Sequence, residues 1–121
     1  SGLLTGFMDI VFEHQGQYFV LDYKSNKLSD YSQESIANSM LSHRYDVQYT
    51  LYILALHRLL KSRLQAYNYE QHVGGAIYLY LRGIDQTGQG LYANKPPWEL
   101  IRALDEAFKS NQPSSLAGAI K

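Results

Sequence analysis

The feature that most constrains this chain is a pair of apolar segments that carry charged side chains, Gly6–Phe12 and Val20–Lys24. The first segment contains Asp9, and the second contains Asp22 and Lys24. Residues two apart share one face of a β-strand, and a charge in a half-buried strand is costly unless something pairs with it. The sequence therefore predicts a β-hairpin that gathers these three side chains.

The turn of this hairpin predicts which residues face each other. The turn spans His14–Gln17, with Gln15 and Gly16 at its tip, because glycine tolerates positive φ. A two-residue tip pairs residue i with residue 31 − i, which places Asp9 opposite Asp22. Their Cβ atoms would then lie about 4.5–5.5 Å apart, on the face that also carries Lys24.

Two carboxylates at that separation repel each other, and one of them would resist ionisation. A divalent cation between them removes the conflict, and carboxylate oxygens suit magnesium or manganese. Lys24 could then reach a water molecule or a phosphate held by the metal. In the alternative reading, Asp9 and Asp22 are ordinary solvent-facing strand residues. Their predicted opposition argues against this, since like charges directly opposite destabilise a hairpin.

Three motifs follow one another along the chain: Gly6-x-x-Asp9, Asp22-Tyr23-Lys24 and Gln48-x-x-x-Tyr52. This ordered set resembles the catalytic hairpin of the PD-(D/E)XK nucleases and the Gln-x-x-x-Tyr motif of their RecB-like branch. The resemblance continues in the segment 74–83 and covers roughly residues 3 to 110. It implies an α/β, restriction-endonuclease-like fold in which helices flank a mixed sheet.

The resemblance also implies a role for each motif residue. Asp9, Asp22 and the backbone carbonyl of Tyr23 would bind the metal, and Lys24 would join the two carboxylates as the third catalytic group. Gln48 and Tyr52, four residues apart on one helical face, would bind the DNA substrate or orient Lys24. The alternative for this pair is the polar flank of a core helix.

For the whole protein, the resemblance implies a magnesium-dependent DNA nuclease module, with manganese as the alternative metal. Such a module belongs to a helicase-nuclease that acts in double-strand break repair and recombination in the bacterial cytoplasm. The implied partners are single-stranded DNA, RecC- and RecD-like subunits and a RecA-type recombinase. Two other hypotheses stay open, a non-catalytic protein-interaction module and a metal-binding fold that acts on RNA.

One departure concerns the start of the chain. The family places a metal-binding histidine and a helix before the first catalytic strand, whereas here only a few residues, beginning at Ser1, precede that strand. We therefore expect residues 1–121 to form a partial nuclease domain that lacks its N-terminal helix. Such a fragment would bind magnesium weakly, cut DNA poorly and self-associate through its uncovered sheet.

The composition fits one globular domain. The chain has 121 residues, of which 45% are hydrophobic, and 11 basic residues balance 11 acidic ones. A zero net charge is mild evidence against an autonomous DNA-binding module, which usually carries a basic patch. The chain has no cysteine, so neither disulfides nor thiolate metal sites exist.

The remaining pattern predicts the other elements. We expect helices at 33–42, 45–64 and 98–110, a buried strand at 73–81, and loops at 66–72 and 83–97. Asp30 or Ser32 would cap the first helix. His43 and His57 are expected on helix surfaces. In the long helix the expected core stripe comprises Val47, Leu51, Leu54, Leu56, Leu59 and Leu60.

Overall fold

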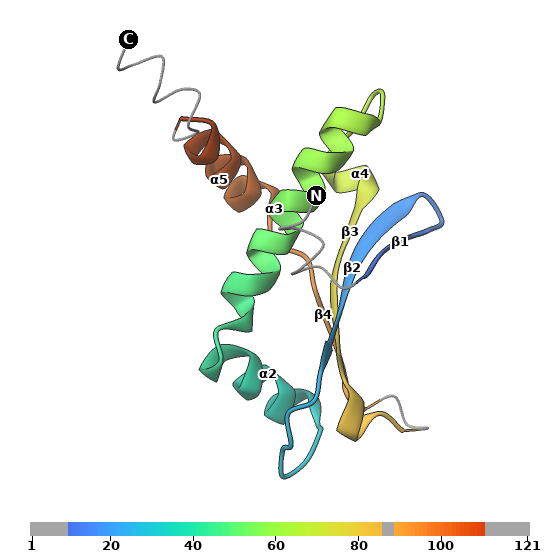
Figure 1. Cartoon of the computed structure of the whole chain (residues 1–121), viewed down its shortest axis with the longest axis vertical. Coiled ribbons are helices and arrows are strands. Elements are labelled where there is room, and N and C mark those ends of the chain that lie inside the picture. Colours follow the sequence, from blue (N-terminus) through green and yellow to red (C-terminus); the bar gives the residue numbers. More distant parts are fainter. Residues whose placement is uncertain (1–9, 86–88, 111–121) are drawn as a thin grey trace.

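The computed structural model describes residues 10–85 and 89–110, which form one mixed sheet and its helices (Figure 1). The sheet has the strand order β1-β2-β3-β4. This confirms the expected α/β fold. The elements are β1 (Ile10–His14), β2 (Gln17–Lys24), α2 (Gln33–Ser42), α3 (Tyr45–Arg63), α4 (Tyr69–His72), β3 (Val73–Tyr80), the 3-10 turn η1 (Leu81–Gly83), β4 (Leu91–Asn94) and α5 (Trp98–Ser110).

The β1–β2 hairpin has the predicted register. Ile10 pairs with Leu21 and His14 pairs with Gln17, so each described pair sums to 31. At the tip, Gln15 and Gly16 have φ angles of 53° and 81°. Both values are positive, as a type I′ turn in a two-residue hairpin requires. Asp9, the residue expected opposite Asp22, lies outside the described residues.

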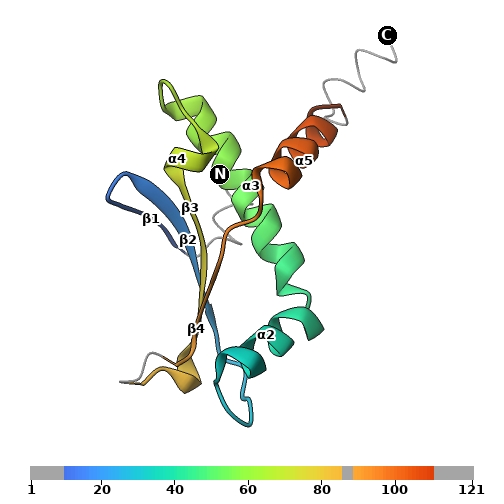
Figure 2. The same cartoon turned by 180° about the vertical axis from the view of Figure 1, so that it is seen from behind.

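The centre of the sheet is the parallel pair β2–β3, and β4 pairs antiparallel with β3. Helices α2 and α3 lie over one face of the sheet, and α5 packs against α3 (Figures 1 and 2). On this helix-covered face, Val20, Ala76 and Tyr78 are buried. No described helix covers the opposite face, which we call the far face (Figure 2).

Most helix bounds agree with the predicted ones. Helix α2 begins after Ser32, whose Oγ accepts a hydrogen bond from the backbone N–H of Ser35 at 3.2 Å. This is the predicted N-terminal cap, and the carboxylate of Asp30 in turn accepts a hydrogen bond from the Ser32 hydroxyl. Helix α3 runs without glycine or proline until Arg63, close to the expected end at 64.

The expected core stripe of α3 was partly wrong. Leu54, Leu56 and Leu60 are buried, but Val47 and Leu51 are 47% and 54% exposed and Leu59 is only half-buried. Helix α3 instead buries Tyr52, Ile53 and His57 in the core. Tyrosine rings carry large apolar area with one polar tip, so they take core positions that a count of aliphatic residues assigns elsewhere.

Two short elements occur where loops were expected. Asn68 caps the one-turn helix α4, accepting a hydrogen bond from the Gln71 N–H at 2.9 Å. Strand β4 is only four residues long and is held by its pairing with β3. Such elements depend on tertiary partners, so local sequence carries little signal for them.

Candidate active site

Asp22 and Lys24 lie near the C-terminal end of β2, on the helix-covered face. Asp22 is 4% exposed, and Lys24 Nζ lies 3.2 Å from its Oδ2. The expectation that these two side chains share a face is confirmed. A short strand segment thus places an anion and a cation side by side under the helices, where low solvent exposure strengthens their attraction.

The neighbouring strand contributes Tyr78, which pairs directly with Asp22. Its side chain is fully buried, and its hydroxyl donates a hydrogen bond to Oε1 of Gln48 at 2.7 Å. Burial raises the pKa of Tyr78 above its ordinary value, and the nearby Asp22 charge raises it further. Tyr78 therefore stays a neutral hydrogen-bond donor.

Aromatic rings surround the Lys24 ammonium. Its Nζ lies 4.1 Å from the centroid of the Tyr45 ring and 5.5 Å from that of Tyr78. The two tyrosine rings are themselves stacked, with centroids 5.9 Å apart. The electron-rich face of an aromatic ring attracts a cation, so this arrangement favours one position of a flexible side chain.

The residues of the Gln-x-x-x-Tyr motif both come from α3. Gln48 is half-buried and reaches the site through its hydrogen bond with Tyr78. Tyr52, one turn later, is only 6% exposed and belongs to the buried core. The structure therefore brings Gln48 into contact with Tyr78, the register partner of Asp22, and places Tyr52 in the core.

Sequence reasoning missed Tyr78 and did not connect Tyr45 to Lys24. The signal for Tyr78 was weak, because it is one of two tyrosines in a strand that is apolar on both faces. Only the parallel register of β2 and β3 makes it a neighbour of Asp22.

The donor set at this end of the sheet suits a hard divalent cation. Asp22 has carboxylate oxygens, the ligand type that magnesium and manganese take. Among residues 10–85 and 89–110, no three His, Asp or Glu side chains converge on one point. The remaining expected carboxylate, Asp9, is outside this part of the chain.

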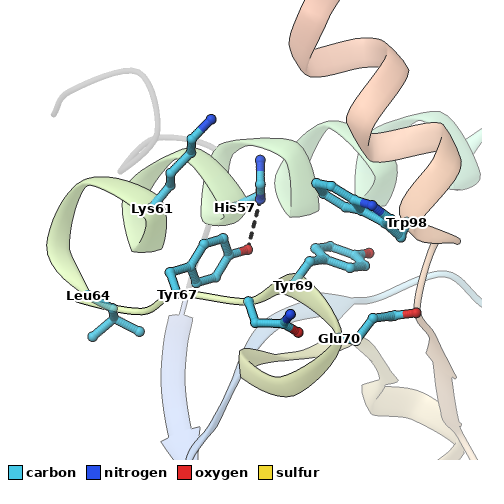
Figure 3. Close-up of a pocket in the computed structure, with 8 residues that line it drawn as sticks. His57, Lys61, Leu64, Tyr67, Tyr69, Glu70 and Trp98 are labelled. Carbon is cyan, nitrogen blue, oxygen red and sulfur yellow. Dashed lines mark hydrogen bonds between the residues drawn. The ribbon is translucent and has the colours of Figure 1, made fainter.

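A cavity of about 380 Å³ lies at the opposite end of β3, beside α4 (Figure 3). His57 in its wall is 2% exposed, so the expected surface position of this histidine was wrong. The ring Nδ1 of His57 lies 2.8 Å from the Tyr67 hydroxyl. The lining residues are His57, Lys61, Leu64, Tyr67, Asn68, Tyr69, Glu70 and Trp98.

Behind this cavity, the buried carboxylate of Asp105 joins α5 to α3. It accepts a hydrogen bond from Arg58, and Lys61 Nζ and Lys109 Nζ each lie 3.7 Å away. Burial alone would raise the pKa of Asp105, but the Arg58 hydrogen bond and the surrounding positive charges lower it overall.

His57 also lies beside Asp105, with Nε2 at 3.5 Å from Oδ2. The hydroxyl of Tyr69, in the cavity wall, donates to the Pro96 carbonyl. Asp105 thus links α5 to α3 through Arg58, Lys61 and His57, and the Tyr69 hydroxyl bonds separately to Pro96. The cavity is a structural junction, and the candidate active site is the Asp22–Lys24 end of the sheet.

None of the described helices has the length and apolar character that crossing a membrane requires.

Comparisons with known proteins match nearly the whole chain, including the candidate active site. The model of the PD-(D/E)XK nuclease superfamily matches residues 2–119. The RecBCD enzyme subunit RecB of Escherichia coli (strain K12) is 51% identical over 113 residues, which cover 88% of this chain and 10% of that protein.

More distant relatives carry the same name. The RecB subunit of Haemophilus influenzae is 45% identical over 113 residues, covering 89% of this chain and 9% of its own length. The RecB subunit of Mycobacterium tuberculosis is 36% identical over 118 residues, which cover 87% of this chain and 11% of that protein. The chain thus spans about a tenth of the length of these curated relatives.

Proposed function

Because the chain belongs to the PD-(D/E)XK nuclease superfamily, we propose that it is the catalytic module of a DNA nuclease that hydrolyses phosphodiester bonds. The observation that carries the proposal is the pair of Asp22 and Lys24, 3.2 Å apart on one face of β2. A carboxylate can hold a metal ion and an ammonium can stabilise negative charge on the phosphate, and both roles serve metal-assisted hydrolysis of a phosphodiester.

In this proposal Asp9, Asp22 and the backbone carbonyl of Tyr23 hold a divalent cation, magnesium with manganese as the alternative. Oxygen atoms make up this donor set, which supports a hard cation. When bound, the cation lowers the pKa of coordinated water and offsets charge on the phosphate. The Lys24 ammonium orients the attacking water and stabilises the negative charge that grows on the phosphate in the transition state.

Gln48 and Tyr52 form the proposed substrate side of the site. The Gln48 carbonyl oxygen is taken by the Tyr78 hydroxyl, which leaves the amide nitrogen as the donor for a DNA phosphate. Tyr52 is 6% exposed and belongs to the buried core, so it offers DNA little surface of its own.

The relatives' name, RecBCD enzyme subunit RecB, supports a place in a RecBCD-type helicase-nuclease of double-strand break repair and recombination. The proposed substrate is single-stranded DNA, and the proposed partners are RecC- and RecD-like subunits and a RecA-type recombinase in the bacterial cytoplasm. The balanced charge of the chain supports a module that receives DNA from a larger assembly, because it offers little phosphate-neutralising charge of its own.

The test uses the full-length protein and labelled single-stranded DNA. Lys24→Met should reduce the cleavage rate roughly 100- to 1,000-fold, the usual cost of removing one transition-state-stabilising group. Lys27→Met is the matched control, because this exposed lysine lies three residues further along the chain. The proposal fails if Lys24→Met and Lys27→Met cut DNA at the same rate as the unchanged protein.

A second arm addresses the non-catalytic alternative. Calorimetric titration with magnesium, combined with the cleavage assay, separates a working site from an incomplete one. Magnesium binding together with cleavage supports the nuclease, whereas neither binding nor cleavage favours an interaction module. An RNA strand of the same sequence, cut faster than DNA, would favour the third hypothesis.

A further inference from the structure

Two aromatic rings of the described residues lie over the Lys24 ammonium, and that of Tyr45 is the nearer. Its centroid is 4.1 Å from Lys24 Nζ, against 5.5 Å for Tyr78. We propose that Tyr45 is a positioning residue for the nuclease reaction, which holds the Lys24 ammonium beside Asp22. The proposal rests on the proposed function of Lys24. Tyr45 belongs to none of the three motifs that mark the site.

The reason such a residue is needed is the flexibility of lysine. Its ammonium sits on a four-carbon stem with many rotamers, and an ion pair is not directional. In this site Asp22 attracts the ammonium from one side at 3.2 Å, and the Tyr45 and Tyr78 rings lie against it. A ring face adds a second attraction that favours one location, which is what fixed geometry at a reacting centre requires.

Tyr45 is itself held in place from several directions. It is the first residue of α3, directly after Arg44, whose φ of 55° turns the chain sharply. Its ring stacks on His43 with centroids 5.2 Å apart, and on Tyr78 at 5.9 Å. The ring therefore has little freedom to move away from Lys24.

A hydrogen bond also ties the ring to the segment that carries Lys24. The side-chain amide of Asn26 donates to the Tyr45 hydroxyl at 3.1 Å, and Asn26 is two residues after Lys24. This bond links the end of β2 to the start of α3. It positions the ring, whereas the ring face provides the contact with the ammonium.

These two contributions make the proposal testable by substitution at one position. Tyr45→Phe removes the hydroxyl and keeps the ring, whereas Tyr45→Leu keeps apolar bulk and removes the ring. Tyr49→Leu is the matched control. Tyr49 is a half-buried tyrosine one turn further along α3, and its ring contacts Tyr78 and Tyr92 instead of Lys24.

The experiment measures kcat and KM for single-stranded DNA cleavage by the full-length protein and these variants. Tyr45→Leu should lower kcat roughly 3- to 30-fold, the range that corresponds to one cation–π contact, with little change in KM. Tyr45→Phe keeps the ring, so its kcat should stay within about 2-fold of that of the unchanged protein. Tyr49→Leu should leave kcat unaltered.

Fluorination gives a second test that does not depend on a large change of shape. Each fluorine added to Phe at position 45 weakens the negative ring face while nearly preserving its volume, so kcat should fall stepwise along the series. An unchanged kcat across the fluorinated series, an unchanged kcat for Tyr45→Leu, or a loss confined to KM would overturn the proposal. Equal losses in Tyr45→Leu and Tyr49→Leu, or in Tyr45→Phe and Tyr45→Leu, would overturn it as well.

The failure of the proposed function gives a different result. If Lys24→Met cuts DNA at the unchanged rate, Lys24 has no catalytic role and the proposed function is at fault. If Lys24→Met is inactive while Tyr45→Leu is fully active, the proposed function stands and the positioning role of Tyr45 is rejected.

Discussion

The ammonium of Lys24 and the carboxylate of Asp22 form a largely enclosed ion pair, with Nζ 3.2 Å from Oδ2 and side chains that are 14% and 6% exposed. Enclosed ion pairs are costly to break on one side only, because the remaining charge keeps its desolvation penalty. The pair therefore links the proposed chemistry to the stability of the fold.

Lys24→Met should lower the free energy of unfolding of the 121-residue chain by about 1–3 kcal/mol. The double variant Lys24→Met/Asp22→Asn should recover part of that loss, because neither charge is then left in the enclosed site. Urea denaturation of the single and double variants measures this coupling. Strictly additive losses would show that the two charges do not interact.

The His57–Asp105 junction should make stability depend on pH. Burial lowers the pKa of His57 below its ordinary value of 6.5, and the Asp105 charge opposes this only in part. As the pH falls below about 6.5, His57 binds a proton in the unfolded chain but not yet in the folded chain. The free energy of unfolding therefore decreases. The slope cannot exceed about 1.4 kcal/mol per pH unit, which is the value for one proton.

His57→Gln should remove this slope between pH 6.5 and the lowered pKa of the folded state, as urea denaturation over a pH series would show. His43→Gln is the control, because His43 is exposed at the end of α2. Asp105 should add a second loss only below about 3.8, since its folded pKa is also lowered. Equal slopes in both histidine variants would contradict the assignment.

The far face of the sheet should cause the 121-residue chain to self-associate. Ile10, Tyr23 and Leu91 are 36%, 41% and 44% exposed there, beside the half-buried Leu21 and Leu79. Contiguous apolar patches of this kind are uncommon on the surface of a monomer. Sedimentation velocity should therefore show species larger than a monomer.

The double substitution Ile10→Lys/Leu91→Lys should shift the chain toward the monomer, because it places two charges on the far face. Val47→Lys/Leu51→Lys is the control, since these exposed apolar residues lie on α3 and not on the far face. If the control changes the sedimentation as much as the far-face variant does, association occurs elsewhere.

Local sequence rules predicted the hairpin and the helices well. A two-residue turn at Gln15–Gly16 fixes the register of β1 and β2, and Ser32 marks the start of α2. These features depend on interactions between residues a few positions apart. The pairing of Asp22 and Lys24 on one face follows from the same short-range geometry.

The parts that sequence did not predict depend on partners far along the chain. His57 is buried because Asp105, on another helix, and Tyr67 lie against it. Tyr78 becomes a neighbour of Asp22 only through a parallel register that no local pattern encodes. The contact between Tyr45 and Lys24 likewise exists only after α3 docks on the sheet.

The most direct test of the central claim is the rate of DNA cleavage by the full-length protein that carries Asp22→Asn. This change keeps the shape of the side chain and removes the charge that the proposed metal site and Lys24 both need. Asp46→Asn, at a surface carboxylate paired with Arg44, is the matched control. We predict that Asp22→Asn abolishes cleavage while Asp46→Asn cuts at the unchanged rate. Cleavage by Asp22→Asn at the rate of the unchanged protein would contradict the account.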